Sequence, residues 1–302
     1  MNQDKIGIIG CGWLGLPLAK SLISNNYKVK GSTTRKNKLT VLKKEGIDPF
    51  LIEITDNSIS ESISSFLKGL DILIINIPPR IRNEGEINYS KKIKNIINKT
   101  SKLKNILFIS STSVYGSTQG KISSETIPYP DSKNGIEILK TENLIKSENN
   151  TIIRFGGLIS EDRNPLKYLI QKNQILNPLA PINYIHLEDC IGIISKVISK
   201  KKWGKIYSGV APFHPTKKEY YDNLCDSKRI KTLNFSNKKT VINKEINLTK
   251  LLINKWNSEE SEINGTISEI DESEGAPMII IVNEKGKRND LNKKQSYGKT
   301  IF

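Results

Sequence analysis

The chain has 302 residues, of which 36% are hydrophobic and 26% charged, so we expect a globular protein with a sizeable core. No apolar run is long enough for a secretory signal or a membrane span, and we expect a cytoplasmic protein. Three scattered cysteines offer no disulfide framework, and two histidines make no convincing metal site. The net charge of +16 comes from lysines spread along the chain, so nucleic acid is not expected as the main partner.

A glycine cluster follows the first apolar run, residues 6–9 (IGII). Gly10, Gly12 and Gly15 have the spacing G-x-G-x-x-G, and the apolar face of a helix comes next. Such glycines permit a tight turn, a close approach of the backbone to a pyrophosphate, and close packing of helix on strand. The helix N-terminus offers N–H groups to phosphates. We therefore predict dinucleotide binding here; a glycine-rich turn without a ligand is the alternative. The predicted cofactor-binding residues of this turn are Gly10, Gly12, Trp13, Leu14 and Gly15.

The second predicted strand, residues 27–32 (YKVKGS), ends where a dinucleotide-binding fold contacts the adenine ribose. An acidic residue there would bind the ribose 2′-hydroxyl of NAD. This sequence has Thr34 and Arg35 instead, with Lys36 and Lys38 close by. Because a hydroxyl and a guanidinium fit a 2′-phosphate, we favour NADP as the cofactor, with NAD still possible. The alternative is a solvated arginine in a loop.

Strands and helices keep alternating over the following residues. The predicted strands are residues 50–54, 71–77 and 105–109, and the predicted helices are residues 39–44, 58–67 and 88–100. The nearly continuous apolar run at 71–77 (DILIINI) is typical of a parallel strand buried on both faces. Asp56 and Pro78 follow two of these strands and are predicted cofactor contacts. The alternation predicts an α/β fold with a doubly wound parallel sheet.

Together with the glycine turn, three later segments resemble the extended short-chain dehydrogenases/reductases, the family of nucleotide-sugar epimerases and dehydratases. They are residues 110–116 (SSTSVYG), 151–156 (TIIRFG) and 183–191 (NYIHLEDCI). Their order and spacing match the family over residues 5–223. The glycine spacing and the Pro-Pro-Arg after the fourth strand resemble an atypical branch of it.

The resemblance implies a Rossmann domain that ends near residue 256, with a small substrate lobe drawn mainly from residues 157–180 and 211–256. It implies hydride transfer on a nucleotide sugar or a related hydroxyl or carbonyl substrate. Outside the resemblance, residues 257–276 are acidic and are predicted to form a linker. Residues 277–302 are predicted to form a basic tail with one strand, at residues 278–282.

The family's chemistry uses a Ser or Thr that hydrogen-bonds the substrate oxygen, a Tyr that transfers the proton, and a Lys four residues later that lowers the pKa of the Tyr. The motif match places Ser111 in the first role, with Thr112 as the alternative. A polar loop after a strand is the other interpretation of these residues.

The Tyr and the Lys can be matched in two registers. In the first, Asn134 stands in the Tyr position and Ile138 in the Lys position, so the catalytic pair is absent. In the second, Tyr129 and Lys133 form a literal Y-x-x-x-K. Pro130 after the tyrosine and Gly135 both weaken a helix through the second register, so a helix over residues 135–146 and the first register are favoured. The protein is then either an enzyme that uses another acid, Tyr129 or Tyr115, or a non-catalytic NADP-binding sensor or partner-binding module.

Overall fold

A computed structural model describes residues 4–79, 88–101, 103–236 and 242–249, and the backbone of two further strands, Gly265–Asp271 and Met278–Asn283. The chain divides into two compact units. Unit 1 comprises Met1–Thr118, Ser124–Gly156 and Cys190–Gly209, and unit 2 comprises Gln119–Ser123, Gly157–Asp189 and Val210–Phe302. The ranges assigned above to a substrate lobe fall in unit 2.

A seven-stranded parallel sheet forms the centre of unit 1, with the order β10-β7-β5-β4-β1-β2-β3. The strands are β1 (Lys5–Ile9), β2 (Lys28–Thr33), β3 (Asp48–Leu51), β4 (Ile72–Ile75), β5 (Asn105–Ser111), β7 (Thr151–Phe155) and β10 (Ile206–Gly209). Every residue of β4 is buried, because a central parallel strand is covered on both faces. The doubly wound sheet predicted from the alternation is confirmed.

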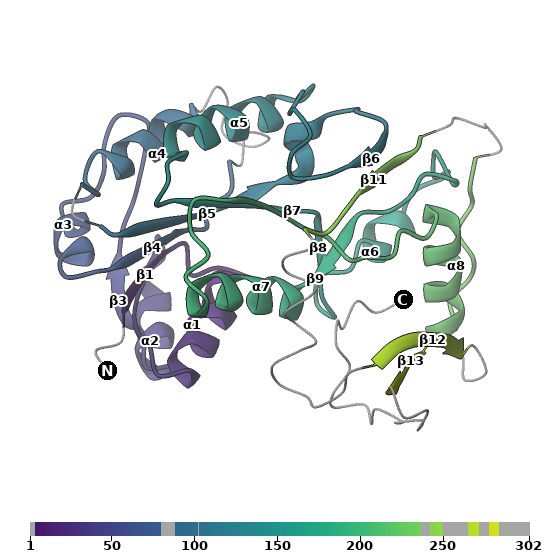
Figure 1. The fold of residues 1–302 in the computed structure, drawn as a ribbon, viewed down its shortest axis with the longest axis horizontal. Coiled ribbons are helices and arrows are strands. Elements are labelled where there is room, and N and C mark those ends of the chain that lie inside the picture. Colours follow the sequence, from purple (N-terminus) through teal and green to yellow (C-terminus); the bar gives the residue numbers. More distant parts are fainter. Residues whose placement is uncertain are drawn as a thin grey trace. The chain divides into compact units, whose positions relative to one another are not determined.

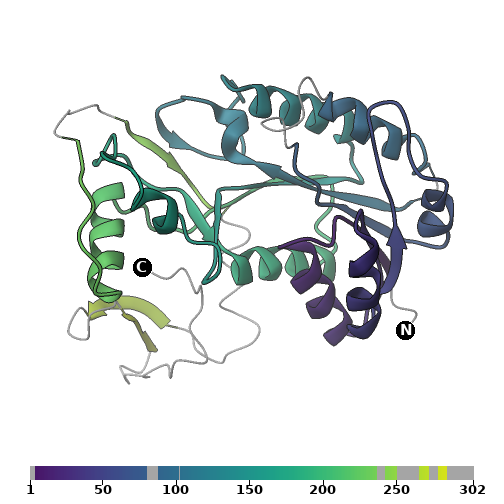
Figure 2. The same cartoon turned by 180° about the vertical axis from the view of Figure 1, so that it is seen from behind.

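Helices cover both faces of this sheet, with α1, α2 and α7 on one face and α4 and α5 on the other (Figures 1 and 2). The helices of unit 1 are α1 (Gly15–Ser24), α2 (Lys36–Lys44), α3 (Ser62–Leu67), α4 (Tyr89–Ile97), α5 (Lys133–Ile145) and α7 (Leu187–Ser199), the last of which begins in unit 2. A short 3-10 helix, η1 (Thr112–Tyr115), follows β5 directly. The order of the strands reverses between β1 and β4, and such a switch point is where open α/β sheets bind ligands.

The predicted strand and the predicted helix on either side of residue 55 are both shorter than expected. The predicted strand 50–54 ends at Leu51, and the predicted helix 58–67 begins at Ser62. Between them, the N–H of Thr55 donates to the carbonyl of Ser58 at 2.8 Å, which forms a turn. Side-chain hydroxyls that bond nearby backbone groups favour such a turn over a continued strand or helix.

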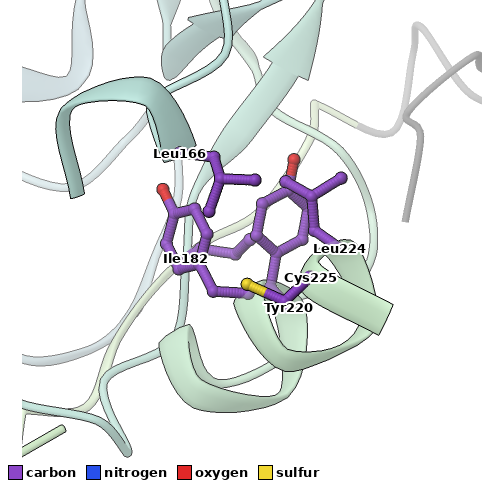
Figure 3. Close-up of a cluster of buried hydrophobic side chains, with 6 residues drawn as sticks. Leu166, Ile182, Tyr220, Leu224 and Cys225 are labelled. Carbon is purple, nitrogen blue, oxygen red and sulfur yellow. The ribbon is translucent and has the colours of Figure 1, made fainter. Parts of the chain in front are cut away.

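The part of unit 2 that the structure describes contains three two-stranded sheets and two helices. They are β6 (Gly120–Ile122) with β11 (Lys244–Ile246), β8 (Gly157–Ile159) with β9 (Tyr184–His186), β12 (Gly265–Asp271) with β13 (Met278–Asn283), α6 (Leu166–Leu169) and α8 (Lys217–Ser227). Leu166 of α6, Ile182 and the buried face of α8 pack into one apolar cluster (Figure 3). Within it, the rings of Tyr220 and Tyr221 meet edge to face, with centroids 5.0 Å apart. This cluster gives unit 2 a hydrophobic core of its own.

The C-terminal stretch departs from its prediction in one part. The expectation of a linker over residues 257–276 is wrong for β12, which pairs antiparallel with β13. The linker was predicted from the acidic composition of the segment. The strand contains the β-branched residues Thr266, Ile267 and Ile270, and these residue types favour strands. The strand predicted at residues 278–282 is confirmed by β13. The predicted basic tail after residue 283 lies outside the described residues.

Candidate functional site: a dinucleotide pocket in unit 1

The glycine turn lies between β1 and α1, and its three glycines have different surroundings. Gly10 has a φ of +101°, and a Cβ added there would lie 2.5 Å from the carbonyl oxygen of Asn76. A Cβ on Gly15 would lie 2.2 Å from the carbonyl oxygen of Gly10. These two glycines are required by the fold itself. A Cβ on Gly12, in contrast, would meet nothing within 4 Å, so the space over Gly12 is free for a ligand.

The ends of two neighbouring strands hold this turn in place. The hydroxyl oxygen of Ser32 accepts from the N–H of Gly10 at 3.1 Å, and the carbonyl of Ser32 accepts from the N–H of Cys11 at 2.9 Å. From the other side, the amide of Asn76 donates to the carbonyl of Gly10 at 3.1 Å. Ser32 and Asn76 were not predicted, because their partners are far away in the sequence. The one indication in the sequence was that both are polar residues at the ends of predicted parallel strands.

A pocket of about 670 Å³ opens over the turn, at the carboxyl ends of β1, β2 and β4. The predicted cofactor residues that line it are Gly10, Gly12, Trp13, Thr34, Arg35 and Pro78. Leu14, Gly15 and Asp56 are not among the described lining residues: Leu14 is buried, Gly15 packs against Gly10, and the carbonyl of Asp56 accepts from the Asn95 amide at 3.1 Å. Cys11 also lines the pocket, but burial raises the pKa of its thiol to about 12, so it is no nucleophile.

Charged side chains line the pocket, and two of them follow the end of β2 directly. Arg35 and Lys38 come from the start of α2, and Lys92 comes from α4. Glu53, which follows β3, is an acidic lining residue that sequence reasoning missed. The lining from Ser32 to Arg35 contains no acidic residue. This part of the pocket therefore suits an anionic group.

Ser111, the last residue of β5, forms the N-cap of η1, where its Oγ accepts from the N–H of Ser113 at 3.1 Å. Thr112 is the first residue of η1. The preceding Ser110 points to the opposite side and donates to Glu142 of α5 at 2.5 Å. Tyr115 is fully buried, and its hydroxyl accepts from Arg154 at 2.9 Å. Tyr115 is thus engaged in the core, which leaves Ser111 and Thr112 as the candidate groups at the end of β5.

The position at which α5 begins distinguishes the two possible matches to the family's Tyr and Lys. The helix predicted over residues 135–146 is confirmed by α5, which begins at Lys133 with the Oγ of Ser132 accepting from the N–H of Gly135 at 3.1 Å. Tyr129 precedes the helix and is 78% exposed, and Lys133 is exposed as well. The two residues therefore do not lie one helical turn apart on α5. Asn134 lies in the first turn, and Ile138 is buried.

The first turn of α5 packs against η1. A Cβ on Gly135 would lie 2.6 Å from the carbonyl oxygen of Ser113, so only glycine allows this approach. Asn134, the preceding residue, has a buried Oδ1 that accepts no hydrogen bond from the described residues.

Neither a metal site nor a membrane-spanning helix is found in the described part of the chain. No group of three or more potential ligands there could hold a metal ion. None of the helices described is both long and apolar enough to cross a membrane.

Fold, glycine turn and pocket together define a Rossmann-type domain with a site suited to a nicotinamide dinucleotide. Residues 5–125 match the family model of the NAD-binding domain of 6-phosphogluconate dehydrogenase. The chain is 30% identical over 234 residues to protein YeeZ of Escherichia coli strain K12, covering 74% of this chain and 83% of YeeZ. The chain therefore belongs to the same family as YeeZ, and its N-terminal part matches an NAD-binding domain.

Solved structures share the fold at low sequence identity. A protein from Methylobacillus flagellatus, named for NAD-dependent epimerase/dehydratase activity, has a TM-score of 0.67 at 22% identity, covering 84% of this chain and 92% of its own. UDP-glucuronic acid 4-epimerase from Bacillus cereus, in complex with NAD, has a TM-score of 0.64 at 18% identity, covering 82% and 88%. UDP-glucose 4-epimerase from Thermotoga maritima, with UDP-glucose, has a TM-score of 0.64 at 15% identity, covering 82% and 90%.

Proposed function

We propose that this protein binds NADP(H) in the pocket of unit 1. The observation that supports NADP over NAD is the lining at the end of β2, where Thr34, Arg35 and Lys38 stand without an acidic residue. A guanidinium and an ammonium at the start of α2 favour a 2′-phosphate, which the positive end of the helix dipole also attracts. The same lining offers no carboxylate at the end of β2 for the two ribose hydroxyls of NAD.

The test is calorimetric titration with NADPH and NADH of the wild type and of Arg35→Ala. We expect the variant to lose about 1–3 kcal/mol of NADPH binding free energy and much less of NADH binding free energy. Lys43→Ala removes an exposed charge from the other end of α2 and is the matched control, with both affinities unchanged. Equal losses for NADPH and NADH in Arg35→Ala would remove the assignment of NADP.

We further propose that the protein is an oxidoreductase-type enzyme of the epimerase, dehydratase or reductase kind, acting on a nucleotide sugar or a related hydroxyl or carbonyl substrate. Structural relatives named as epimerases of UDP-sugars support this, as does the match of residues 5–125 to an NAD-binding domain. When bound, the nicotinamide supplies a site that accepts or donates a hydride. Ser111 contributes an O–H that can donate to a substrate oxygen, because its Oγ already accepts from Ser113.

A second candidate is a non-catalytic NADP-binding sensor or partner-binding module. It is favoured by the start of α5, where the first of the two registers puts Asn134 and Ile138 in the positions of the Tyr and the Lys. A carboxamide cannot transfer a proton as an acid, and an isoleucine supplies neither charge nor a hydrogen bond. Tyr129 is the remaining acid of the second register, and it lies outside the helix.

The two candidates are separated by measuring turnover, with nicotinamide absorbance and product analysis, across a panel of nucleotide sugars with NADP⁺ and NADPH. Turnover that falls about 100-fold or more in Ser111→Ala supports the enzyme. Tyr129→Phe then tests the acid: unchanged turnover removes Tyr129 from the mechanism. Tight NADPH binding without turnover on any member of the panel favours the binding module.

A further inference from the structure

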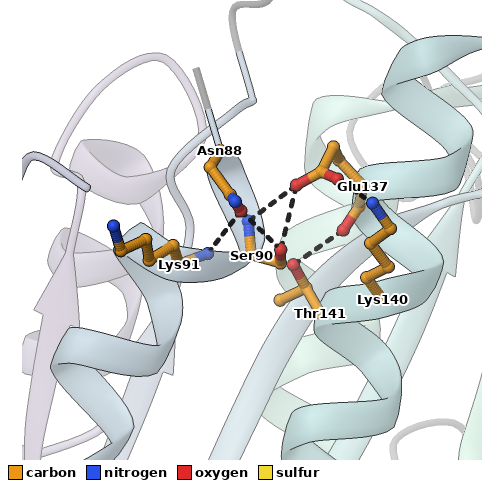
Figure 4. A network of polar contacts seen from close by, with 6 residues as sticks. All are labelled: Asn88, Ser90, Lys91, Glu137, Lys140 and Thr141. Carbon is orange, nitrogen blue, oxygen red and sulfur yellow. Dashed lines mark hydrogen bonds and ion pairs between the residues drawn. The ribbon is translucent and has the colours of Figure 1, made fainter. Parts of the chain in front are cut away.

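The N-terminus of α4 is capped by a carboxylate from a different helix (Figure 4). Glu137 of α5 accepts through Oε2 from the N–H of Ser90 at 3.0 Å and lies 3.0 Å from the hydroxyl of Ser90. The N-cap residue of α4, Asn88, accepts from the N–H of Lys91 at 3.1 Å. A local side chain and a distant one therefore share the orphan N–H groups of this helix.

Glu137 suits this role electrostatically. Its side chain is 13% exposed, and its Oε1 lies 2.7 Å from the ammonium of Lys140. Burial alone would raise the pKa of Glu137, but hydrogen bonds from Lys140 and Ser90 outweigh it and hold the pKa below the ordinary value. The group is therefore a carboxylate at neutral pH, and a negative charge is favourable at a helix N-terminus.

The first turn of α4 is also a wall of the dinucleotide pocket. Tyr89 and Lys92 line the pocket from α4, as does Ile77 after β4. Tyr89 is buried, and its hydroxyl donates to the carbonyl of Ile77 at 2.7 Å. The position of α4 at its first turn thus fixes both the tyrosine and the segment that follows β4.

We propose that Glu137 is a positioning residue for the coenzyme: by capping α4 from α5, it holds the wall formed by Tyr89, Lys92 and Ile77 in its binding geometry. This inference rests on the proposed binding of NADP(H) in this pocket. The same helix α5 packs by Gly135 against η1, next to Ser111. Through Glu137, α5 therefore connects the α4 wall of the pocket with η1, whose N-cap residue is the candidate catalytic Ser111.

The test compares NADPH dissociation constants, measured by calorimetry, with melting temperatures for three variants. Glu137→Ala removes the cap, and we expect its dissociation constant to rise about three- to tenfold at a temperature where it is fully folded. Glu137→Gln keeps an acceptor oxygen for Ser90 and restores most of the affinity. Lys140→Ala removes only the outward ion pair and is the matched control, with wild-type affinity.

A lower melting temperature with an unchanged dissociation constant in Glu137→Ala would overturn the inference, because Glu137 would then serve stability alone. If Glu137→Ala does not fold, Glu137→Asp is measured instead. Its carboxylate is one methylene too short to reach Ser90, and a wild-type dissociation constant would equally overturn the inference. A wild-type protein that binds neither NADPH nor NADH overturns the proposed function, and this inference with it.

Discussion

Glu142 and Arg154 form a buried ion pair, with Glu142 Oε2 2.6 Å from Arg154 Nη2 and both side chains only 3% exposed. The guanidinium Nε lies 3.0 Å from Glu142 Oε1, so the two groups meet through parallel hydrogen bonds. Burial opposes the charge of Arg154, but its bonds to Glu142 and Tyr115 outweigh this and raise its pKa. The pair joins α5 to β7 behind the end of β5, and so it supports the backbone that presents Ser111.

Removing the acid of this pair should be costly. In Glu142→Ala the guanidinium of Arg154 stays buried without its counter-charge, and we expect a loss of about 3–5 kcal/mol in the free energy of unfolding. Urea unfolding of the variant and the wild type measures it. Lys20→Ala breaks the exposed pair of Lys20 with Glu45 and is the control, with a loss below about 1 kcal/mol. Equal losses in the two variants would contradict the structural role of the buried pair.

The glycines of the turn should separate coenzyme binding from folding. Gly12→Val places its side chain in free space over the turn, so we expect a wild-type melting temperature and no measurable binding of NADPH or NADH. Gly15→Ala brings its Cβ against the carbonyl of Gly10, so we expect a lower melting temperature even without coenzyme. Thermal unfolding measures the melting temperatures of the two variants, and calorimetry measures their coenzyme binding. Coenzyme binding at full strength in Gly12→Val would refute the dinucleotide site.

The helix α8 of unit 2 begins with a complete capping box. Thr216 Oγ1 accepts from the N–H of Glu219 at 3.2 Å, and the Glu219 carboxylate accepts from the N–H of Thr216 at 2.8 Å. Thr216 with Glu219 three residues later has the sequence pattern of such a box. We expect Thr216→Ala to lower the free energy of unfolding by about 1 kcal/mol, as measured by urea unfolding, because one N–H loses its acceptor. Thr216→Ser keeps the hydroxyl and is the control; an equal loss in both variants would argue against the cap.

Acid should weaken unit 1 through Asp71. The hydrogen bond from Lys104 and the N–H of Lys5 lower the pKa of its carboxyl, since both favour the charged form. A carboxyl with a lowered folded-state pKa adds stability above its unfolded value, about 3.9, and loses it as the pH falls through the folded value. The stability lost in Asp71→Asn should therefore be largest at neutral pH and shrink below about pH 4. Urea unfolding of the wild type and Asp71→Asn at neutral pH and below about pH 4 measures this loss. An equal loss of stability at the two pH values would assign the effect to packing.

Local sequence predicted the elements because their causes are local. The apolar run at residues 71–77 predicts a strand buried on both faces, and β4 is buried throughout. Pro130 and Gly135 weaken a helix through the residues before 135, so the helix is predicted from residue 135, and α5 begins at Lys133. Gly10, Gly12 and Gly15 predict the turn because this spacing permits a tight turn from strand to helix and a close approach of the backbone to a pyrophosphate. Periodicity and backbone conformation are properties of neighbouring residues, so neighbouring residues suffice to predict them.

Tertiary structure alone decided which distant side chains meet. Ser32 and Asn76 hold the glycine turn, although 22 and 66 residues separate them from Gly10. Glu137 caps a helix that begins 48 residues earlier, and no motif marks it. Such pairings depend on the order of strands in the sheet and on which helix faces meet, and these are set by burial across the whole chain. The sequence therefore determined that a dinucleotide turn forms, while the packing of the sheet and its helices determined which side chains hold and surround the pocket.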